Sequence, residues 1–192
     1  MNYLAHLFLA AGHKELTIGN FIADQVKGSR YKEYPYAIAQ GIVMHRSTDY
    51  FSDTHPLYLK SVHRLTAEHG KFSGIITDML YDHLLASCWG SFSDTDLGEY
   101  CSETYGLLLS GKAVIPENAR RILTYMVQYD WLGSYSTVQG IEQALKGLSR
   151  RMKYYHPLEK AVKNFEADYD GFRHDFEAFF PLLQKHVQQF LP

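Results

Sequence analysis

Apolar side chains recur at three- and four-residue steps along nearly all of the 192 residues, and few stretches alternate with a period of two. The first spacing is that of one helix face, whereas the second would indicate a strand. Helix punctuation is frequent: Lys27-Gly28 resembles a helix end, and Tyr34-Pro35 and Pro116 resemble helix starts. Because no pair of strands could form a sheet, the pattern predicts an all-α fold, organised as a single globular helical domain over residues 1–192.

The periodicity and punctuation together predict helices over residues 2–11, 17–27, 35–51, 55–68, 71–88, 94–109, 116–130, 137–149 and 158–189. Pro181 is a candidate for a break in the last of these helices, because proline removes a helix hydrogen bond. Aromatic residues make up 15% of the chain, and those between Phe165 and Phe180 recur at helical steps. This spacing predicts core packing and gives no support to a haem or flavin site.

The composition excludes several classes of protein. The 19 basic and 21 acidic residues leave a net charge of −2, whereas general nucleic-acid binding needs a basic surplus. No run of about eighteen apolar residues would cross a membrane, and the apolar N-terminus lacks the basic region of a signal peptide. Cys88 and Cys101 form no C-x-x-C pair, so we expect two free thiols in a reducing cytoplasm.

Polar residues replace apolar ones on two of the predicted helices. In the range 35–51, Ile38 and Ile42 begin an apolar stripe whose next positions are His45 and Asp49. Residues four apart lie on the same helix face, so both side chains point toward the core. Burying an ionised carboxylate costs several kcal/mol unless it is paired or binds a cation.

The range 71–88 shows the same anomaly. Ile76 and Met79 lie on its apolar stripe, and the next stripe position is His83. Asp82 lies beside His83 and shares a flank with Asp78. Histidines and carboxylates therefore lie on or next to the core-facing side of two separate helices.

Two interpretations of these residues remain open. Imidazole and carboxylate groups from facing helices suit Mn²⁺, Fe²⁺, Zn²⁺ or Mg²⁺. Alternatively, His45 bonds Asp49 or Asp82 within a satisfied polar core, as most buried polar groups do. Asp24, near a predicted helix end, and His6, on the apolar first helix, are further candidates for the same cluster.

Four short motifs and their order along the chain carry a resemblance to a known family. They are Met1-Asn2-Tyr3-Leu4-Ala5-His6-Leu7, Gly19-Asn20-Phe21-Ile22-Ala23-Asp24, Gly41-Ile42-Val43-Met44-His45-Arg46-Ser47-Thr48-Asp49 and Asp78-Met79-Leu80-Tyr81-Asp82-His83. With Trp131-Leu132 and the segment from Phe165 to Pro181, the chain resembles the bacterial acyl carrier protein phosphodiesterase family over nearly its whole length. It departs from that family at Gln25, where an aromatic residue is common, and at Ser47, where a second basic residue is common.

The resemblance implies a helical fold like that of the HD-type metal-dependent phosphohydrolases. It also implies a divalent cation, typically Mn²⁺, and the removal of 4′-phosphopantetheine from the serine of holo acyl carrier protein. By this resemblance we expect metal ligands or acid–base groups at Asp24, His45, Asp82 and His83. Asp49 and His6 are the next candidates, followed by Asp78.

A bound cation would lower the pKa of water and polarise a phosphate oxygen. In this hypothesis His83 or His6 protonates the leaving serine oxygen. Arg46 either holds the phosphate as a bidentate donor or forms an ordinary surface ion pair. Lys27, Arg30 and Lys32 are candidates for contact with the acidic carrier protein, although charge runs are usually solvated faces.

Two other functions fit the residues. An HD-type phosphohydrolase could act on a nucleotide or another small phosphodiester, although the chain has no G-x-x-x-x-G-K-[ST] phosphate loop. A non-catalytic helical binding module would use the Asp/His cluster only as a polar core. Stabilisation by added Mn²⁺ would separate a metal site from such a core, because a ligand that binds only the folded state raises the melting temperature.

Overall fold

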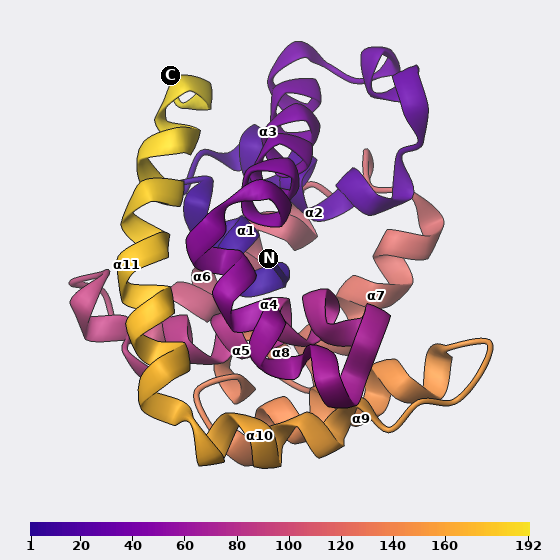
Figure 1. Cartoon of the computed structure of the whole chain (residues 1–192). Coiled ribbons are helices and arrows are strands. Elements are labelled where there is room, and N and C mark those ends of the chain that lie inside the picture. Colours follow the sequence, from indigo (N-terminus) through magenta and orange to yellow (C-terminus); the bar gives the residue numbers. More distant parts are fainter.

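Every regular element of the chain is a helix in the computed structural model, which describes residues 1–192 (Figure 1). The α-helices are α1 (Tyr3–Leu9), α2 (Lys14–Ile22), α3 (Tyr36–Thr54), α4 (Pro56–His69), α5 (Ser73–Ser87), α6 (Leu97–Ser110), α7 (Glu117–Gln128), α8 (Trp131–Ser134), α9 (Val138–Arg151), α10 (Ala161–Ala167) and α11 (Tyr169–Val187). Short 3-10 turns join them at η1 (Ala23–Gln25), η2 (Gly28–Glu33), η3 (Gly70–Phe72), η4 (Trp89–Ser91), η5 (Leu158–Lys160) and η6 (Gln188–Phe190). The prediction of an all-α fold is confirmed. None of these helices combines the length and the hydropathy of a membrane-spanning segment.

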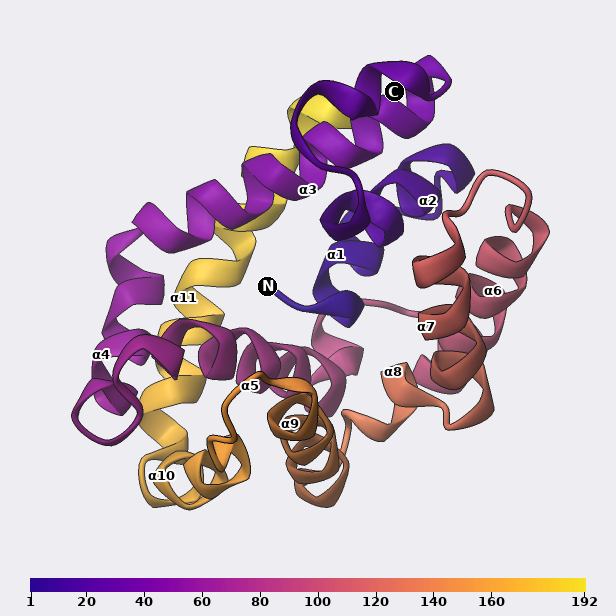
Figure 2. The same ribbon diagram turned by 90° about the vertical axis from the view of Figure 1, so that its right-hand side faces the viewer.

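The aromatic run of α10 and α11 is part of a continuous hydrophobic core. Its five phenylalanines are almost completely buried: Phe165, Phe172, Phe176, Phe179 and Phe180. The rings of Phe176 and Phe179 contact Tyr81 on α5, and Phe180 contacts Phe8 on α1. The prediction that these aromatic side chains pack in the core is confirmed. The long helices α3 and α11 lie beside each other along one side of the molecule (Figure 2).

Two glycines allow α2 and α3 to approach at backbone distance. A Cβ atom added to Gly19 would lie 2.2 Å from the Ile38 carbonyl oxygen, and one added to Gly41 would lie 2.3 Å from the Leu16 carbonyl oxygen. Neither position could hold a side chain without moving the neighbouring helix. Because His45 lies one turn after Gly41, this contact holds His45 close to the end of α2.

The short helix α1 begins in the interior of the molecule, and both views place the N-terminus near the middle (Figures 1 and 2). Its N-cap residue, Asn2, makes no side-chain capping bond. The Asp82 carboxylate on α5 accepts instead from the backbone N–H groups of Leu4, at 2.7 Å, and Ala5, at 3.2 Å. A residue distant in sequence therefore satisfies two donors of the first turn, which helix geometry leaves without partners.

Most predicted helices are present, but three boundaries were wrong. Pro181 lies inside α11, and the break in this part of the chain is at Asp168, whose backbone angles (φ −133°, ψ 38°) are not helical. The helix continues through Pro181 because the core contacts of its neighbours outweigh one lost hydrogen bond. The second helix ends at Ile22, before Lys27-Gly28, and α6 begins at Leu97, three residues after the predicted start at 94, with Asp96 as its N-cap.

Candidate metal centre

Three side chains from α1 and α3 converge on one point. The Nε2 atom of His6 lies 3.0 Å from Oδ1 of Asp49, and the Nε2 atom of His45 lies 3.2 Å from Oδ2 of the same carboxylate. The two imidazole rings are stacked with centroids 3.8 Å apart and an angle of 19° between their planes. One ligand atom from each of the three residues lies within 4.8 Å of the others. We call His6, His45 and Asp49 the triad.

Asp24 joins the triad from the 3-10 turn that follows α2. Its Oδ1 atom lies 3.3 Å from Nε2 of His45, so His45 is placed between two carboxylates. The Asp24 side chain is 69% exposed, whereas the His45 side chain is only 10% exposed. His45 is therefore buried, whereas its partner Asp24 lies at the surface, so a ligand can reach the triad from solvent on the side of Asp24.

The α-ammonium group of Met1 lies next to the triad. It donates to Oδ1 of Asp78 at 2.7 Å and lies 3.6 Å from Oδ1 of Asp49. The Tyr58 hydroxyl also donates to Asp78, at 2.6 Å. Burial disfavours the charged form of this ammonium group, but the negative charges of Asp78 and Asp49 outweigh the effect of burial. Together they raise the pKa of the ammonium to about 10. The group is therefore protonated at neutral pH.

The two histidines have opposite protonation preferences. Burial and the neighbouring His45 lower the pKa of His6 to about 4, although Asp49 opposes the shift. Burial also disfavours the charged form of His45, but its bonds to Asp24 and Asp49 raise its pKa to about 9. The bond from His45 lowers the pKa of Asp24, and bonds from both histidines lower that of Asp49 against the effect of burial. The metal-free site thus holds one imidazolium, at His45, between two carboxylates.

The residues of the triad fit a divalent cation. Two imidazole nitrogens and a carboxylate form a donor set that suits Mn²⁺, Fe²⁺ or Zn²⁺. The Nδ1 atoms of both histidines are buried and have no hydrogen-bond partner in the protein, so each ring keeps a nitrogen that its surroundings do not satisfy. Three protein ligands would leave coordination positions open to a substrate, as in catalytic metal sites. A cation would also replace the His45 proton, since metal and proton compete for the same imidazole.

Comparison with known proteins identifies the family. The sequence model of the family described as "Acyl carrier protein phosphodiesterase" matches residues 1–183. The chain belongs to the acyl carrier protein phosphodiesterase family. It is 30% identical over 189 residues to the acyl carrier protein phosphodiesterase of Yersinia pestis, with 98% of each chain covered. It is 28% identical to that of Photorhabdus laumondii, covering 98% of this chain and 96% of the relative. No solved structure was found to match the chain.

The sequence motifs of this family thus identified it correctly, and the structure shows where each motif places its polar residues. His6, Asp24, His45 and Asp49 come together from three of the four motifs. Asp82 and His83, from the fourth, are not brought to the triad. Both oxygens of Asp82 accept from the backbone of α1, and burial raises its pKa to about 7.

His83 and Asp78 also have partners outside the triad. The Nδ1 atom of His83 lies 2.7 Å from the Tyr135 carbonyl oxygen, and its ring contacts Phe165 edge-on. Asp78 binds the Met1 ammonium and the Tyr58 hydroxyl. Two residues of the fourth motif, Asp78 and Asp82, therefore support the segment of α1 that carries His6. The Met1 ammonium and Tyr58 could not be identified as site groups from the sequence, because neither interrupts an apolar stripe.

Arg46 points away from the triad, toward the segment that follows Asp24. Its guanidinium donates to the carbonyl oxygens of Val26 and Gly28, the latter at 2.8 Å, and lies 5.4 Å from the centre of the Tyr31 ring. Neither interpretation from the sequence, a phosphate ligand or a surface ion pair with a carboxylate, describes these contacts. The three basic residues of this segment are all exposed: Lys27, Arg30 and Lys32. Arg46 thus anchors the backbone that carries them.

Proposed function

We propose that the chain hydrolyses the phosphodiester bond between 4′-phosphopantetheine and the serine of holo acyl carrier protein, in the cytoplasm and with Mn²⁺ as its preferred cation. The observation that carries this proposal is the convergence of the stacked pair His6 and His45 on Asp49. The printed names of the relatives supply the substrate class. Mg²⁺, Fe²⁺ and Zn²⁺ are alternative cations for the same donor set.

In this proposal the triad holds the cation. The Oδ1 atom of Asp24 lies 3.3 Å from the same Nε2 atom of His45, so Asp24 would act as an additional carboxylate ligand when the cation replaces the proton on that nitrogen. When bound, a divalent cation would supply polarisation of a phosphate oxygen and a lowered pKa of water. Asp82 and His83 have no role at the cation in this proposal, because both Asp82 oxygens and the His83 Nδ1 atom have partners elsewhere.

Charge balance supports a cation at this position. The carboxylates of Asp49 and Asp78 lie next to a single ammonium group, that of Met1, and Asp24 and Asp49 both pair with His45. Even with His45 protonated, the metal-free site carries a surplus of negative charge and repels a phosphodiester anion. A divalent cation in place of the His45 proton removes this surplus, because it adds two positive charges and displaces one.

The exposed segment after Asp24 would contact the carrier protein. Lys27, Arg30 and Lys32 present positive charge on the chain segment that continues from the site, and acyl carrier proteins are acidic. Complementary charge accelerates encounter and fixes the orientation of two proteins. Arg46 contributes indirectly, by holding the carbonyl groups of Val26 and Gly28.

The test is direct. Purified protein is analysed for metal content, stripped with EDTA, reloaded with Mn²⁺ and incubated with holo acyl carrier protein. Mass spectrometry should show conversion to the apo form, and EDTA should abolish it. Asp49→Asn should lose both metal and activity, whereas Asp53→Asn, an exposed position one turn further along α3, should keep both.

Holo carrier protein that stays intact with the Mn²⁺-loaded enzyme would overturn the proposal. Hydrolysis of only small phosphodiesters under the same conditions would instead favour the other phosphohydrolase function. Full metal content in folded Asp49→Asn would reject the triad as the metal site.

A further inference from the structure

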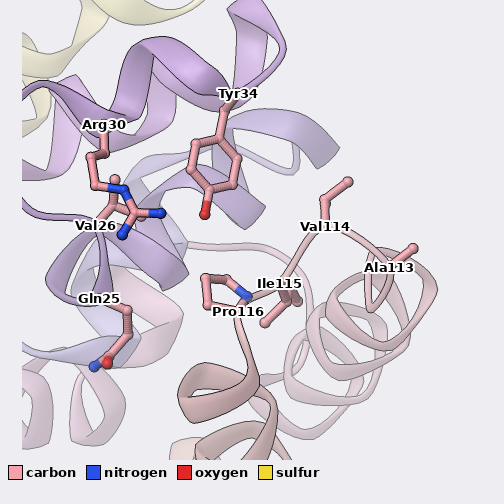
Figure 3. Close-up of a pocket in the computed structure, with 8 residues that line it drawn as sticks. All are labelled: Gln25, Val26, Arg30, Tyr34, Ala113, Val114, Ile115 and Pro116. Atoms are coloured by element: carbon pink, nitrogen blue, oxygen red, sulfur yellow. The ribbon is translucent and has the colours of Figure 1, made fainter.

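A second hollow lies next to the metal centre. It has a volume of about 280 Å³ and is bounded on one side by Gln25, Val26, Arg30 and Tyr34 and on the other by residues 113–116 (Figure 3). The recess at the metal centre, lined by His6, Asp24 and His45 among others, holds only about 20 Å³. That volume is enough for an ion or a single water molecule. The non-reacting parts of a substrate must therefore lie outside the recess.

Consecutive residues of one chain segment line the two hollows. Asp24 lines the recess, and the next two residues, Gln25 and Val26, line the larger pocket. Because neighbouring Cα atoms are about 3.8 Å apart, the lining of the pocket begins within a few ångströms along the chain from Asp24, a distance that a flexible arm of a phosphodiester can span. The chain segment that follows Asp24 is held in place, because the Arg46 guanidinium donates to the carbonyl oxygens of Val26 and Gly28.

The lining has the chemistry of a site for a chain that is partly apolar and carries amide groups. Val26, Ile115 and Pro116 give apolar walls. The Arg30 guanidinium and the Tyr34 hydroxyl point across the pocket toward Pro116 (Figure 3). The Tyr34 hydroxyl and the Gln25 amide add groups to the lining that can donate and accept hydrogen bonds. Apolar walls with a few convergent polar groups are typical of small-molecule sites.

We infer that this pocket binds the pantetheine arm of the substrate, an inference that rests on the proposed function. The arm carries a dimethyl-substituted carbon, which suits the apolar walls, and two amides, which suit Gln25, Arg30 and Tyr34. The pocket thus selects the prosthetic group, while the carrier protein contacts the exposed basic segment.

The experiment fills the pocket from its exposed rim. Val114→Trp places a large ring at a lining residue that is 39% exposed, and Leu109→Trp places the same ring on α6, at a residue that is 42% exposed and does not line the pocket. Each Mn²⁺-loaded variant is assayed with holo acyl carrier protein and with bis(p-nitrophenyl) phosphate, a small diester without the arm. Tyr34→Phe, which removes one hydroxyl, is a milder second variant, and circular dichroism checks the fold of all three.

We expect Val114→Trp to raise the KM for holo carrier protein at least about tenfold, or about 1.4 kcal/mol, with turnover of the small diester unchanged. Leu109→Trp should behave as wild type, and Tyr34→Phe should raise the same KM by a smaller factor. An unchanged KM for holo carrier protein in Val114→Trp, or an equal loss with both substrates, would overturn the inference.

Binding of free pantetheine, followed by NMR, separates this inference from the proposed function. Pantetheine should perturb the signals of residues 113–116 in the wild type and not in Val114→Trp. If the wild-type protein fails to convert holo carrier protein, the proposed function is wrong, and the pantetheine titration alone then tests whether the pocket binds pantetheine. Absence of pantetheine binding to the wild-type protein would overturn the inference.

Discussion

Replacing Gly41 by alanine tests how the fold positions the metal centre. The added Cβ would lie 2.3 Å from the Leu16 carbonyl oxygen and 2.9 Å from the Gly19 Cα atom. Ordinary contacts begin at 3.4 Å, so α2 and α3 must separate by about 1 Å. Both obstructing atoms belong to the backbone, and rotation of a side chain cannot relieve the overlap.

The expected loss of stability is the difference between two effects. Overpacking of this kind costs about 1–3 kcal/mol, and we expect the upper part of that range because backbone atoms are involved. Alanine regains up to about 1 kcal/mol of helix propensity relative to glycine. The free energy of unfolding should therefore fall by about 1–2 kcal/mol, which lowers the Tm by roughly 2–8 °C for a chain of this length.

The same movement should weaken metal binding. His45 lies one turn after Gly41 on α3, whereas Asp24 follows α2, so a separation of these helices opens the 3.3 Å contact between them. Metal sites tolerate ligand displacements of only about 0.2 Å. We expect the affinity of the folded protein for Mn²⁺ to fall at least about tenfold.

Urea unfolding of the metal-free protein and calorimetric titration with Mn²⁺ measure the two effects separately. Gly106→Ala is the matched control: this helical glycine of α6 is exposed, and an added Cβ meets no atom within 4 Å. It should increase the free energy of unfolding by up to about 1 kcal/mol and leave Mn²⁺ affinity unchanged. If Gly41→Ala matches this control in both measurements, the close contact of α2 and α3 does not position the site.

Three further predictions follow from individual contacts. Asp82→Ala should lower the free energy of unfolding by about 2–4 kcal/mol, because two buried N–H groups of α1 lose their acceptors. If Asp82→Asn instead folds with wild-type stability but binds no metal, Asp82 is a metal ligand. In the metal-free protein the pKa of His45 is raised to about 9, so its contribution to the free energy of unfolding is complete below pH 6.5 and should disappear as the pH rises to 9. Over the same interval the affinity for Mn²⁺ should rise by up to about tenfold per pH unit, because the cation displaces a proton. An Mn²⁺ affinity that stays constant between pH 6.5 and 8.5 would contradict this prediction. The double substitution Lys27→Ala and Lys32→Ala should raise the KM for holo carrier protein at low salt, and the difference from wild type should vanish at high salt. A change in KM that does not depend on salt would show that these lysines do not attract the carrier protein by their charge.

The helices themselves were predictable from the sequence because apolar periodicity reports a property of each segment alone. Where that prediction failed, tertiary contacts decided the outcome. Pro181 removes a backbone donor, but Phe179, Phe180 and Leu183 around it are fully buried, and their packing keeps the helix continuous. The break falls at Asp168, which pairs with Arg64 on α4, a residue 104 positions away. No local signal in the sequence indicates such a contact.

The candidate site was predictable to the same extent. A histidine or carboxylate on an apolar stripe indicates a buried polar group, and the structure does bury His6, His45, Asp82 and His83. The stripe says nothing about which group compensates the burial. For His45 the i,i+4 relation with Asp49 supplied that partner locally, whereas the partner of Asp82 is the backbone of a helix 77 residues earlier in the chain.

Loss of activity in a variant of this protein can therefore follow from loss of a metal ligand or from loss of a residue that supports the ligands. The triad depends on α1 for His6, and α1 is held to α5 by the Asp82 cap and by the ion pair between Asp78 and the Met1 ammonium. Substitution of Asp82 or Asp78 should therefore reduce catalysis as surely as substitution of a ligand, although neither residue belongs to the triad. Only metal content measured on folded variants, beside their free energy of unfolding, separates the two groups, since a ligand variant loses metal even where it stays folded, whereas a supporting variant loses stability and keeps metal where it stays folded.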